Sequence, residues 1–449
     1  MAHSAAPFLV IIVGGSLVGL TTALALGKAG IDFLVLERQE IAPNAGASIS
    51  IHPHIQRVME QLGVWPEIKE RVYPLGQRYH YDEHGYLLDH SKILLEISKM
   101  TLGRWTTFME RKFELQCIYN QIQDKTRVRS NCRVVSYTES QHGVEVTTDQ
   151  GETLVGDMLI GADGIHSSIR RLLADKMEDR DPAAAREMRE GFESTHHCIF
   201  ATSANVNSSH LGEPFLAAGE VHNVYYRGFS GVAAAGAPGL VFWFLFVKSD
   251  GVTRTPNTPQ FTEAEMEATI SKYGHHKLGS NYTFQDLWMG RQKAAMVPLE
   301  EGVLRTKWHS GGRVVLVGDS VHKATVNPGL GGNLAVEGVV HLLNELVPWV
   351  HRCVAEEART PTKEELVSVF DEYEKRQRPH ANLIVSRSGY ITRYEAMETW
   401  WLRALLRISP WISDHIKANG FVSYMKEGPW LSFLPNPDES AVHDTSSHK

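Results

Sequence analysis

The sequence predicts an α/β fold in which a parallel-sheet domain, assembled from separated segments, surrounds an inserted antiparallel β-sheet and is followed by a helical C-terminal region. Two glycine-rich segments, residues 14–19 and 318–333, each follow a short apolar run of the kind that forms a buried parallel strand. Between them, apolar and polar residues alternate as they do in antiparallel strands. We therefore expect both ends of the chain to contribute to one domain.

The composition excludes several classes of protein. At 449 residues the chain exceeds the usual size of a single hydrophobic core, so we expect at least two domains. A net charge of −7 argues against a nucleic-acid-binding protein. The four cysteines are scattered without metal-binding spacing, and we expect reduced thiols, no metal site and a cytoplasmic protein.

The N-terminal residues predict a β-α-β unit. Residues 8–13 form a continuous apolar run bounded by glycine, which predicts a buried strand. Residues 17–29 predict a helix that Gly30 terminates, and residues 33–36 predict the second strand, which ends at Glu37. A unit of this kind is typical of dinucleotide-binding domains.

The glycine pattern indicates where a dinucleotide would bind. Gly14 permits a tight turn after the strand, Gly15 and Ser16 continue it, and Gly19 lets helix and strand approach closely. The free N–H groups at the helix start then receive the pyrophosphate. Glu37 is placed to accept hydrogen bonds from the adenosine ribose, and its charge disfavours a 2′-phosphate. Ser16 replaces the middle glycine, so a simple glycine turn and a surface acid remain the alternatives.

Further along the chain the pattern predicts strands and one long helix. Residues 144–148 and 152–155 predict a hairpin around residues 149–151, and an apolar strand then ends at residues 161–164 with the sequence Gly-Ala-Asp-Gly. The other predicted elements are strands over 198–201, 223–227, 240–247 and 313–317, and a helix over 333–346.

Three motifs in this order resemble the signatures of the class A flavoprotein monooxygenases, whose prototype is the para-hydroxybenzoate hydroxylase fold. They are the glycine-rich segment 14–19 with Glu37, the segment 161–164, and the segment 318–333 with its Gly-Asp-Ser-Val-His start. The resemblance implies a Rossmann-like FAD-binding domain comprising residues 1–80, 106–185 and 299–395. It also implies a substrate domain of residues 81–105 and 186–298, followed by a C-terminal helical region and tail over 396–449.

A finer resemblance is to the fungal paxilline-type indole-diterpene and meroterpenoid epoxidases. It is carried by residues 46–49, 111–115, 241–244 and 318–323. In addition to the N-terminal glycines, Ser16 and Glu37, this resemblance implies FAD contacts from Arg38, Gly46, Ala47, Ser50, Arg111, Asp163, Asp319, Gly331, Gly332 and Asn333. A surface ion pair at Arg111 and a helix cap at Asp319 are the ordinary alternatives.

The resemblance also implies a function: epoxidation of a prenyl, farnesyl-type double bond in a small apolar substrate, with O2 and with NADPH as a transient reductant. Reduced flavin activates dioxygen and supplies an electrophilic oxygen atom, so the protein must position the alkene and exclude water. An apolar substrate requires an aromatic pocket, for which Phe242, Trp243, Phe244 and Phe246 have suitable chemistry. The alternatives are a phenol hydroxylase of the same family and a non-catalytic flavin-binding protein.

The candidate catalytic residues depend on this resemblance. Relatives often carry an arginine before the cysteine that matches Cys198, where this chain has His197. A catalytic tyrosine of the family could correspond to Tyr225 or to Tyr226. Without the resemblance, both tyrosines read as ordinary strand residues.

The C-terminal region is unusually rich in tryptophan. Basic residues lie between Trp400, Trp401, Trp411 and Trp430. A helical region packed on the body of the protein is the main interpretation, and a peripheral membrane contact is the alternative. No apolar stretch reaches the roughly 20 residues that span a bilayer, and residues from 437 onward have the composition of a disordered tail.

Overall fold

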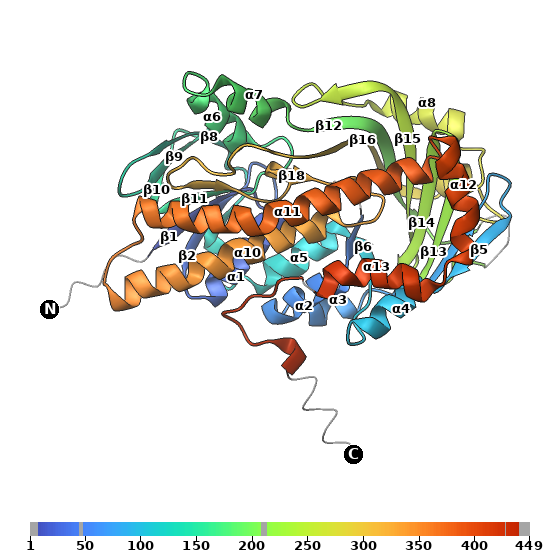
Figure 1. Cartoon of the computed structure of the whole chain (residues 1–449), viewed down its shortest axis with the longest axis horizontal. Helices are drawn as coiled ribbons and strands as arrows, with labels where there is room; N and C mark the ends of the chain where they lie inside the picture. Colours follow the sequence, from blue (N-terminus) through green and yellow to red (C-terminus); the bar gives the residue numbers. More distant parts are fainter. Residues whose placement is uncertain (1–7, 45–47, 208–212, 427, 440–449) are drawn as a thin grey trace, which may run out of the picture.

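A parallel sheet of five strands organises one half of the molecule (Figure 1). The structure is a computed structural model and describes residues 8–44, 48–207, 213–426 and 428–439. The strand order is β17-β11-β1-β2-β7, and all neighbouring strands run parallel. The strands are β1 (Leu9–Val13), β2 (Asp32–Leu36), β7 (Val128–Arg129), β11 (Met158–Gly161) and β17 (Val314–Leu316). The predicted assembly from distant segments is confirmed.

Two helices from opposite ends of the chain pack on each other beside this sheet. Helix α1 (Leu17–Lys28) follows β1, and Gly30 behind it adopts a left-handed conformation with φ 71°. Helix α10 (Gly331–His351) packs on α1 and on the long helix α11 (Lys363–Glu395). Helix α5 (Arg111–Gln121) packs on the other side of α1. The sequence pattern therefore predicted α1 and α10 correctly.

Smaller elements complete this half. The three-stranded antiparallel sheet β10-β9-β8 contains the predicted hairpin, whose turn has Gly151 at φ 79°. Its strands are β8 (Val134–Glu139), β9 (Val144–Thr148) and β10 (Thr153–Gly156), and a separate antiparallel pair consists of β3 (Ser48–Ile51) and β6 (Thr107–Glu110). The remaining helices here are α2 (Pro53–Leu62), α3 (Trp65–Lys69), α4 (Ile93–Met100), α6 (Ser168–Met177) and α7 (Pro182–Glu190), with short helical turns at Lys125–Arg127, Gly318–Ser320 and Arg352–Glu356.

An eight-stranded sheet forms the other half, with the order β18-β16-β12-β15-β14-β13-β4-β5. Its strands are β4 (Gln77–Tyr81), β5 (Leu87–Ser91), β12 (Glu193–Ala204), β13 (Glu220–Tyr226), β14 (Phe229–Ala237), β15 (Leu240–Arg254), β16 (Arg291–Val303) and β18 (His322–Lys323). All pairs are antiparallel except β13 with β4. The predicted inserted antiparallel sheet is therefore present.

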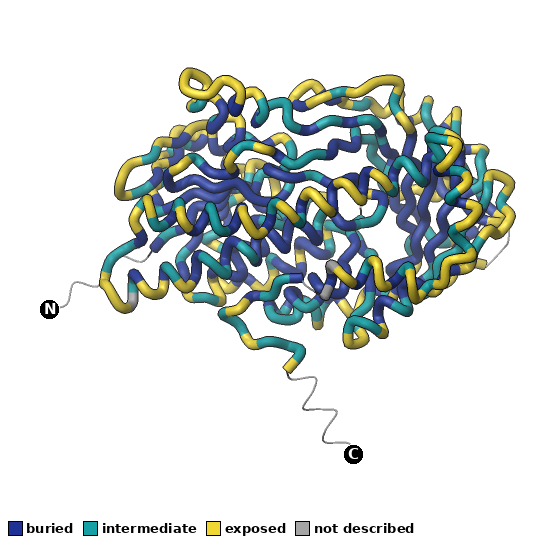
Figure 2. The backbone as a smooth tube through the Cα atoms, in the orientation of Figure 1, coloured by how far each residue is buried: buried dark blue, intermediate teal, exposed yellow. Residues whose placement is uncertain are grey.

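The central strands of the large sheet, such as β13 and β14, are buried on both faces (Figure 2). One face packs on the first half of the molecule and shares its core through residues such as Phe244 and Phe246. The opposite face forms a second core with helices α8 (Glu263–Tyr273) and α9 (Phe284–Met289). Because strand residues alternate between faces, β15 contributes to both cores.

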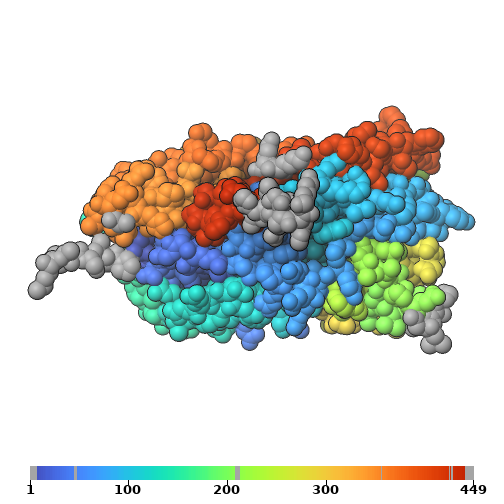
Figure 3. Space-filling model, turned by 90° about the horizontal axis from the view of Figure 1, so that it is seen from below, coloured from blue at the N-terminus to red at the C-terminus, as the bar shows by residue number. Residues whose placement is uncertain are grey.

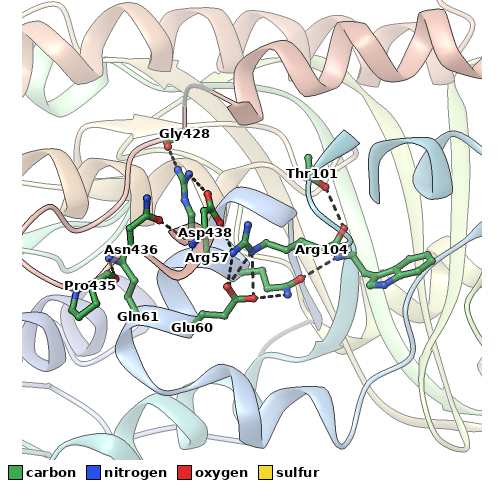
Figure 4. A network of polar contacts seen from close by, with 11 residues as sticks. Arg57, Glu60, Gln61, Thr101, Arg104, Gly428, Pro435, Asn436 and Asp438 are labelled. Atoms are coloured by element: carbon green, nitrogen blue, oxygen red, sulfur yellow. Dashed lines mark hydrogen bonds and ion pairs between the residues drawn. The ribbon is translucent and has the colours of Figure 1, made fainter. Parts of the chain in front are cut away.

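After α11, the C-terminal region runs back from the large sheet to pack on α4 and α2. After α11 come α12 (Trp400–Ile408), the turn Ser409–Trp411 and α13 (Asp414–Lys426). The last described residues then lie between α10 and α2 (Figure 3), where Asn344 Nδ2 donates to the Trp430 carbonyl at 2.8 Å and Gln61 Nε2 donates to the Leu431 carbonyl at 2.9 Å. In Figure 4, Asp438 meets Arg57 at 3.2 Å and Arg104 at 2.6 Å.

These ion pairs bear on the predicted tail. Asp438 lies within the segment from residue 437 whose composition indicated disorder, yet two arginines hold it. Local composition could not show this, because both arginines come from the first quarter of the chain. Residues 440–449 lie outside the described residues.

Candidate active site

The first glycine-rich segment forms a turn that only glycine can occupy. Gly14 has φ 109°, and a Cβ atom there would lie 2.4 Å from the Ala162 carbonyl oxygen. A Cβ atom at Gly19 would lie 1.8 Å from the Gly14 carbonyl oxygen. Both distances are far below van der Waals contact, so these glycines bring β1, β11 and the start of α1 together.

No side chain in the described part of the protein caps the N-terminus of α1. Ser16 is the N-cap residue, but its hydroxyl makes no capping hydrogen bond, and the first turn holds no acidic residue. The Ser16 hydroxyl instead accepts a hydrogen bond from Arg111 at the start of α5. Unpaired N–H groups and the helix dipole suit an anion here, and Arg111 adds a positive charge beside it.

Glu37 lies at the end of β2 against this turn. Its Oε2 accepts from the Gly15 N–H at 2.6 Å, and its Oε1 accepts from the Gln39 N–H at 2.8 Å. A carboxylate has about four lone-pair positions, so two backbone bonds leave acceptor capacity for ribose hydroxyls. Arg38, the next residue, is exposed to solvent.

The second glycine-rich segment meets the first in space. A Cβ atom at Gly332 would lie 2.9 Å from Ile49 Cδ1 and 3.3 Å from Leu17 Cδ2, at the start of α1. A Cβ atom at Gly318 would lie 2.8 Å from Val18 Cγ2. Like α1, helix α10 starts without a capping side chain or an acidic first turn. The N-termini of α1 and α10 and the strand β3 therefore lie side by side, and together they are called the cradle below.

Asn333 holds this region together. Its Oδ1 accepts from the His52 N–H at 2.9 Å, and its Nδ2 donates to the carbonyl oxygens of Ser50 and Gly329, each at 2.8 Å. Asn333 therefore joins the end of β3 to the loop before α10. A Cβ atom at Gly331 would make only an ordinary van der Waals contact, 3.7 Å from the Ala324 carbonyl oxygen.

The two aspartates implied by the resemblance have local partners. Asp163 Oδ2 accepts from the N–H groups of Ser168 at 2.6 Å and Ile169 at 3.1 Å, at the start of α6. Asp319 forms an ion pair with Lys323. Both lie beside the cradle, while Gly46 and Ala47 lie outside the described residues.

A group of aromatic rings joins β6, the partner strand of β3, to β15 of the large sheet. Phe108 of β6 is the register partner of Ser50, and its ring centroid lies 5.6 Å from Phe242 and 5.9 Å from Phe244. Phe246 stacks on Phe244 at 5.6 Å. These four rings, Phe108, Phe242, Phe244 and Phe246, are called the aromatic row below, and they form an apolar surface next to the cradle.

Trp243 is not part of the aromatic row. It belongs to the second core, where its ring lies 6.3 Å from Trp288, and its Nε1–H donates to Ser203 Oγ at 2.8 Å. The alternation of β15 places it on the opposite face from Phe242 and Phe244.

The candidate catalytic residues are divided between the same two faces. The face of the large sheet that packs on the first half of the molecule is called the inner face below, and the face covered by α8 and α9 the outer face. Tyr225 lies on the inner face, where its hydroxyl lies 2.5 Å from His80 Nδ1. Tyr226 belongs to the second core, and its hydroxyl donates to the Lys277 carbonyl at 2.9 Å. His197 also lies on the outer face, where its Nδ1 is 3.0 Å from Ser249 Oγ and its ring centroid is 5.3 Å from that of Phe261. The structure therefore does not bring the three together.

Polar residues that the sequence analysis did not single out surround Tyr225. Arg78 Nε donates to Asn223 Oδ1 at 2.7 Å, and Asn223 Nδ2 donates to Glu395 Oε1 at 3.4 Å. Burial lowers the pKa of His80 well below its usual value, with Arg78 acting in the same direction, so its imidazole is neutral. Burial also raises the pKa of Tyr225 well above its usual value.

One signal for this cluster was present in the sequence. Arg78 and His80 occupy alternate positions of β4, separated by Tyr79, so strand periodicity puts both basic side chains on one face. No comparable signal points to Glu395, because it lies at the end of a helix far along the chain.

The residues present fit FAD. The clash-free turn at Gly14 and Gly19, the open N-termini of α1 and α10, and Arg111 suit a pyrophosphate and a flavin ring system in one continuous site. Within the described ranges, no group of three His, Cys, Asp or Glu residues could hold a metal ion. No described helix has the length and apolar character needed to cross a membrane.

Comparisons with known proteins agree with this geometry. Residues 8–388 match the family described as FAD binding domain. The chain is 32% identical to the FAD-dependent monooxygenase olcE of Penicillium canescens, over 96% of this chain and 91% of that protein. It is also 32% identical to the FAD-dependent monooxygenase spyC of Aspergillus fumigatus, over 97% and 90% of the two chains.

Solved structures share the fold. Klebsiella pneumoniae HpxO, solved with FAD and uric acid, aligns with a TM-score of 0.73 at 19% identity, covering 94% of this chain and 97% of that one. CtdE, solved with FAD and a substrate, aligns with a TM-score of 0.66 at 17% identity, covering 94% of this chain and 99% of that one. The resemblance to class A flavoprotein monooxygenases is thus confirmed: the chain belongs to the FAD binding domain family and is an FAD-dependent monooxygenase.

Proposed function

We propose that the enzyme epoxidises a prenyl, farnesyl-type double bond of a meroterpenoid or related terpenoid in fungal secondary metabolism, with NADPH and O2 as co-substrates. The aromatic row is the observation that carries this proposal. Its four rings pack on one another, and Phe108 pairs with Ser50 of β3, so the row adjoins the proposed FAD site and suits an isoprenoid chain better than a small polar substrate. NADPH is proposed from the family resemblance.

The chain's own residues would bind the cofactor and exclude water. When bound, FAD supplies the redox chemistry that activates O2. The proposed contacts are the N–H groups at the start of α1 for the pyrophosphate, Glu37 for the ribose, and Arg111 for the phosphate charge. Asn333 and Ser50 would shape the flavin end, because their hydrogen bond fixes β3 against the start of α10.

The remaining FAD contacts are proposed from the resemblance. Asp163 and Asp319 lie next to the cradle but already have partners on α6 and Lys323. Arg38 is exposed, and a contact with the adenosine end is proposed for it.

Among the candidate catalytic residues, Tyr225 is proposed to contact substrate. It shares the inner face of the large sheet with the aromatic row, whereas Tyr226 and His197 lie on the outer face. The Tyr225 hydroxyl, hydrogen-bonded to a neutral His80, can orient a polar group of the substrate.

The same polar residues favour a second candidate function, hydroxylation of a phenol. Such an enzyme needs polar groups that hold a phenol beside the flavin, and Arg78, His80 and Tyr225 provide them. Epoxidation uses the aromatic row, and phenol hydroxylation uses this polar cluster. A prenylated polyketide contains both kinds of group.

We also propose that the C-terminal region contacts a membrane surface. Helix α12 buries Leu402 and Leu406 against the body but exposes Trp400 to 75%, and Trp411 beyond it is 88% exposed. Arg403 and Arg407 accompany this apolar face. Tryptophans beside basic residues are typical of segments that lie in the interface of an anionic bilayer, where an apolar substrate would also partition.

One experiment separates the two candidate reactions. The FAD-loaded enzyme is supplied with NADPH and O2, together with farnesylated polyketides or unprenylated phenols, and the product is analysed by NMR. Oxirane carbons in the product support epoxidation, and a new ring hydroxyl supports hydroxylation. Substrates that never stimulate NADPH oxidation would contradict both.

A further inference from the structure

Glu395, the last residue of α11, is a buried carboxyl between the two halves of the proposed site. It is 4% exposed. Its Oε2 accepts from Asn327 Nδ2 at 2.7 Å, and its Oε1 accepts from Asn223 Nδ2 at 3.4 Å. Asn327 belongs to the loop before α10, and Asn223 belongs to β13 of the large sheet. One carboxyl group therefore bridges the cofactor side and the substrate side.

The two amides are oriented by further partners. Asn223 Oδ1 accepts from Arg78 Nε at 2.7 Å, so its nitrogen must face Glu395. Asn327 Oδ1 lies 2.8 Å from Thr392 Oγ1, which also lies 2.8 Å from Thr325 Oγ1. Both asparagines thus present donors to Glu395, which is the arrangement that an ionised carboxylate needs.

Burying the Glu395 carboxyl group costs free energy of folding, which indicates that the carboxyl group has a function. Burying a carboxylate removes it from water, and two amide donors recover only part of that free energy. The loop 327–329 has a second attachment, because Asn333 Nδ2 donates to the Gly329 carbonyl oxygen at 2.8 Å. The loop is therefore fixed at two points, by Asn333 toward the cradle and by Glu395 toward the sheet.

We propose that Glu395 is a positioning residue that ties the loop 327–329 to the substrate sheet and so fixes the flavin end of the site relative to the substrate. This inference rests on the proposed function only in placing the flavin beside this loop. It applies equally to an epoxidase and to a phenol hydroxylase.

Protonation should weaken this tie. Burial raises the pKa of Glu395 to about 7, against the opposing effects of Arg78 and Asn327. The titratable groups that interact with it are Arg78 on β4, Tyr225 on β13 and Tyr394 on its own helix. Behind them, His80 on β4 contacts Tyr225, and Asp89 on β5 interacts with both tyrosines. Protonation removes the negative charge that strengthens both hydrogen bonds and makes the protonated oxygen a weaker acceptor, so the loop 327–329 is held less firmly against the sheet.

The test uses the FAD-loaded enzyme and the variant Glu395→Gln, which keeps the shape but removes the charge. The visible spectrum of bound FAD, which requires no substrate, is recorded between about pH 5.5 and 8.5. In the wild type, we expect a spectral change with an apparent pKa near the value for Glu395. In Glu395→Gln we expect that change to vanish, while the FAD content stays within about twofold of wild type.

With any substrate that stimulates NADPH oxidation, the fraction of NADPH converted into oxygenated product should fall at least about fivefold in Glu395→Gln. Glu374→Gln, a second buried glutamate of α11, is the matched control and should keep both the pH-dependent spectrum and the product fraction. An unchanged pH dependence in Glu395→Gln would overturn the proposal. If the wild type shows the pH-dependent spectrum but forms no oxygenated product, that result would count against the proposed reaction alone.

A second variant guards against misfolding. Asn223→Ala removes the sheet end of the bridge without changing a charge, and we expect it to lower the product fraction as Glu395→Gln does. If Glu395 acts through Asn223, the double variant should be no worse than either single variant. Effects that simply add would overturn the proposed bridge.

Discussion

Gly332, at the start of α10, lies against Leu17, the first residue of α1, with 3.3 Å between the Cβ position of Gly332 and Leu17 Cδ2. The two residues come from opposite ends of the chain. Their contact brings two uncapped helix N-termini to the same region, and each has unpaired N–H groups. One extended dinucleotide can bind both, which is why the site requires both ends of the sequence.

The first prediction concerns the ribose contact. Glu37→Ala removes the acceptor for the Gly15 N–H and the acceptor proposed for the ribose, so FAD affinity should fall at least about tenfold, or about 1.4 kcal/mol. Titration of the apoprotein with FAD, followed by flavin fluorescence, measures this. Glu40→Ala makes the same charge change at an exposed neighbour and should bind FAD normally. Equal affinities in the two variants would contradict the assignment.

The second prediction concerns the aromatic row. Phe246→Ala and Leu245→Ala each remove a buried side chain from β15, and each should cost about 2–5 kcal/mol of stability. Only Phe246 lies on the inner face, so only Phe246→Ala should raise KM for a prenylated substrate. Steady-state kinetics at a temperature where both variants stay folded provide the measurement. A similar rise in KM for Leu245→Ala would show that the sheet face does not matter.

The third prediction concerns stability at mildly acidic pH. Burial lowers the pKa of His322 to about 4, well below the value of 6.5 expected in the unfolded chain. The unfolded state therefore binds the proton more tightly, and the free energy of unfolding should fall as the pH drops below 6.5. The slope approaches about 1.4 kcal/mol per pH unit for this histidine. Burial similarly lowers the pKa of His341 to about 4.

Urea unfolding of the holoenzyme at several pH values checks this. His322→Gln should flatten the pH dependence relative to wild type, while a substitution of the exposed His415 should leave it unchanged. Stability that stayed constant down to about pH 5 would contradict a neutral, buried His322.

The fourth prediction concerns the membrane surface. Replacing Trp400 and Trp411 by Ser should weaken binding to vesicles of phosphatidylserine and phosphatidylcholine by at least about tenfold, because each exposed indole would otherwise bury apolar area. Co-sedimentation measures the bound fraction. Met289→Ser, which changes a residue that is 75% exposed on α9, is the control. If the enzyme does not bind vesicles but forms dimers that require these tryptophans, the partner of this surface is a second copy of the chain.

Local sequence signals sufficed for much of the fold. The strands β1 and β2, the helix α1 and the hairpin of β9 and β10 were predicted closely, because glycine turns and apolar periodicity are local properties. The contact between the two glycine-rich segments was also predicted, through the order of the three family motifs.

Which face of a strand meets the cofactor could not be predicted locally. Alternation shows that Tyr225 and Tyr226 point in opposite directions, but only the packing of α8 and α9 on one face decides which is inside. Trp243 and His197 were affected by the same ambiguity. The bridge formed by Glu395 joins residues far apart in the chain, so no local pattern could reveal it.

The most direct test of the account is the flavin-to-protein ratio of purified variants altered at one end of the site. Gly19→Ala places a Cβ atom 1.8 Å from the Gly14 carbonyl oxygen, and Gly332→Val adds bulk against Ile49 and Leu17. Both should retain less than about a tenth of the wild-type FAD, while Gly420→Ala, which meets no neighbour within 4 Å, should retain all of it. Full FAD content in either Gly19→Ala or Gly332→Val would contradict a single site formed by both ends of the chain.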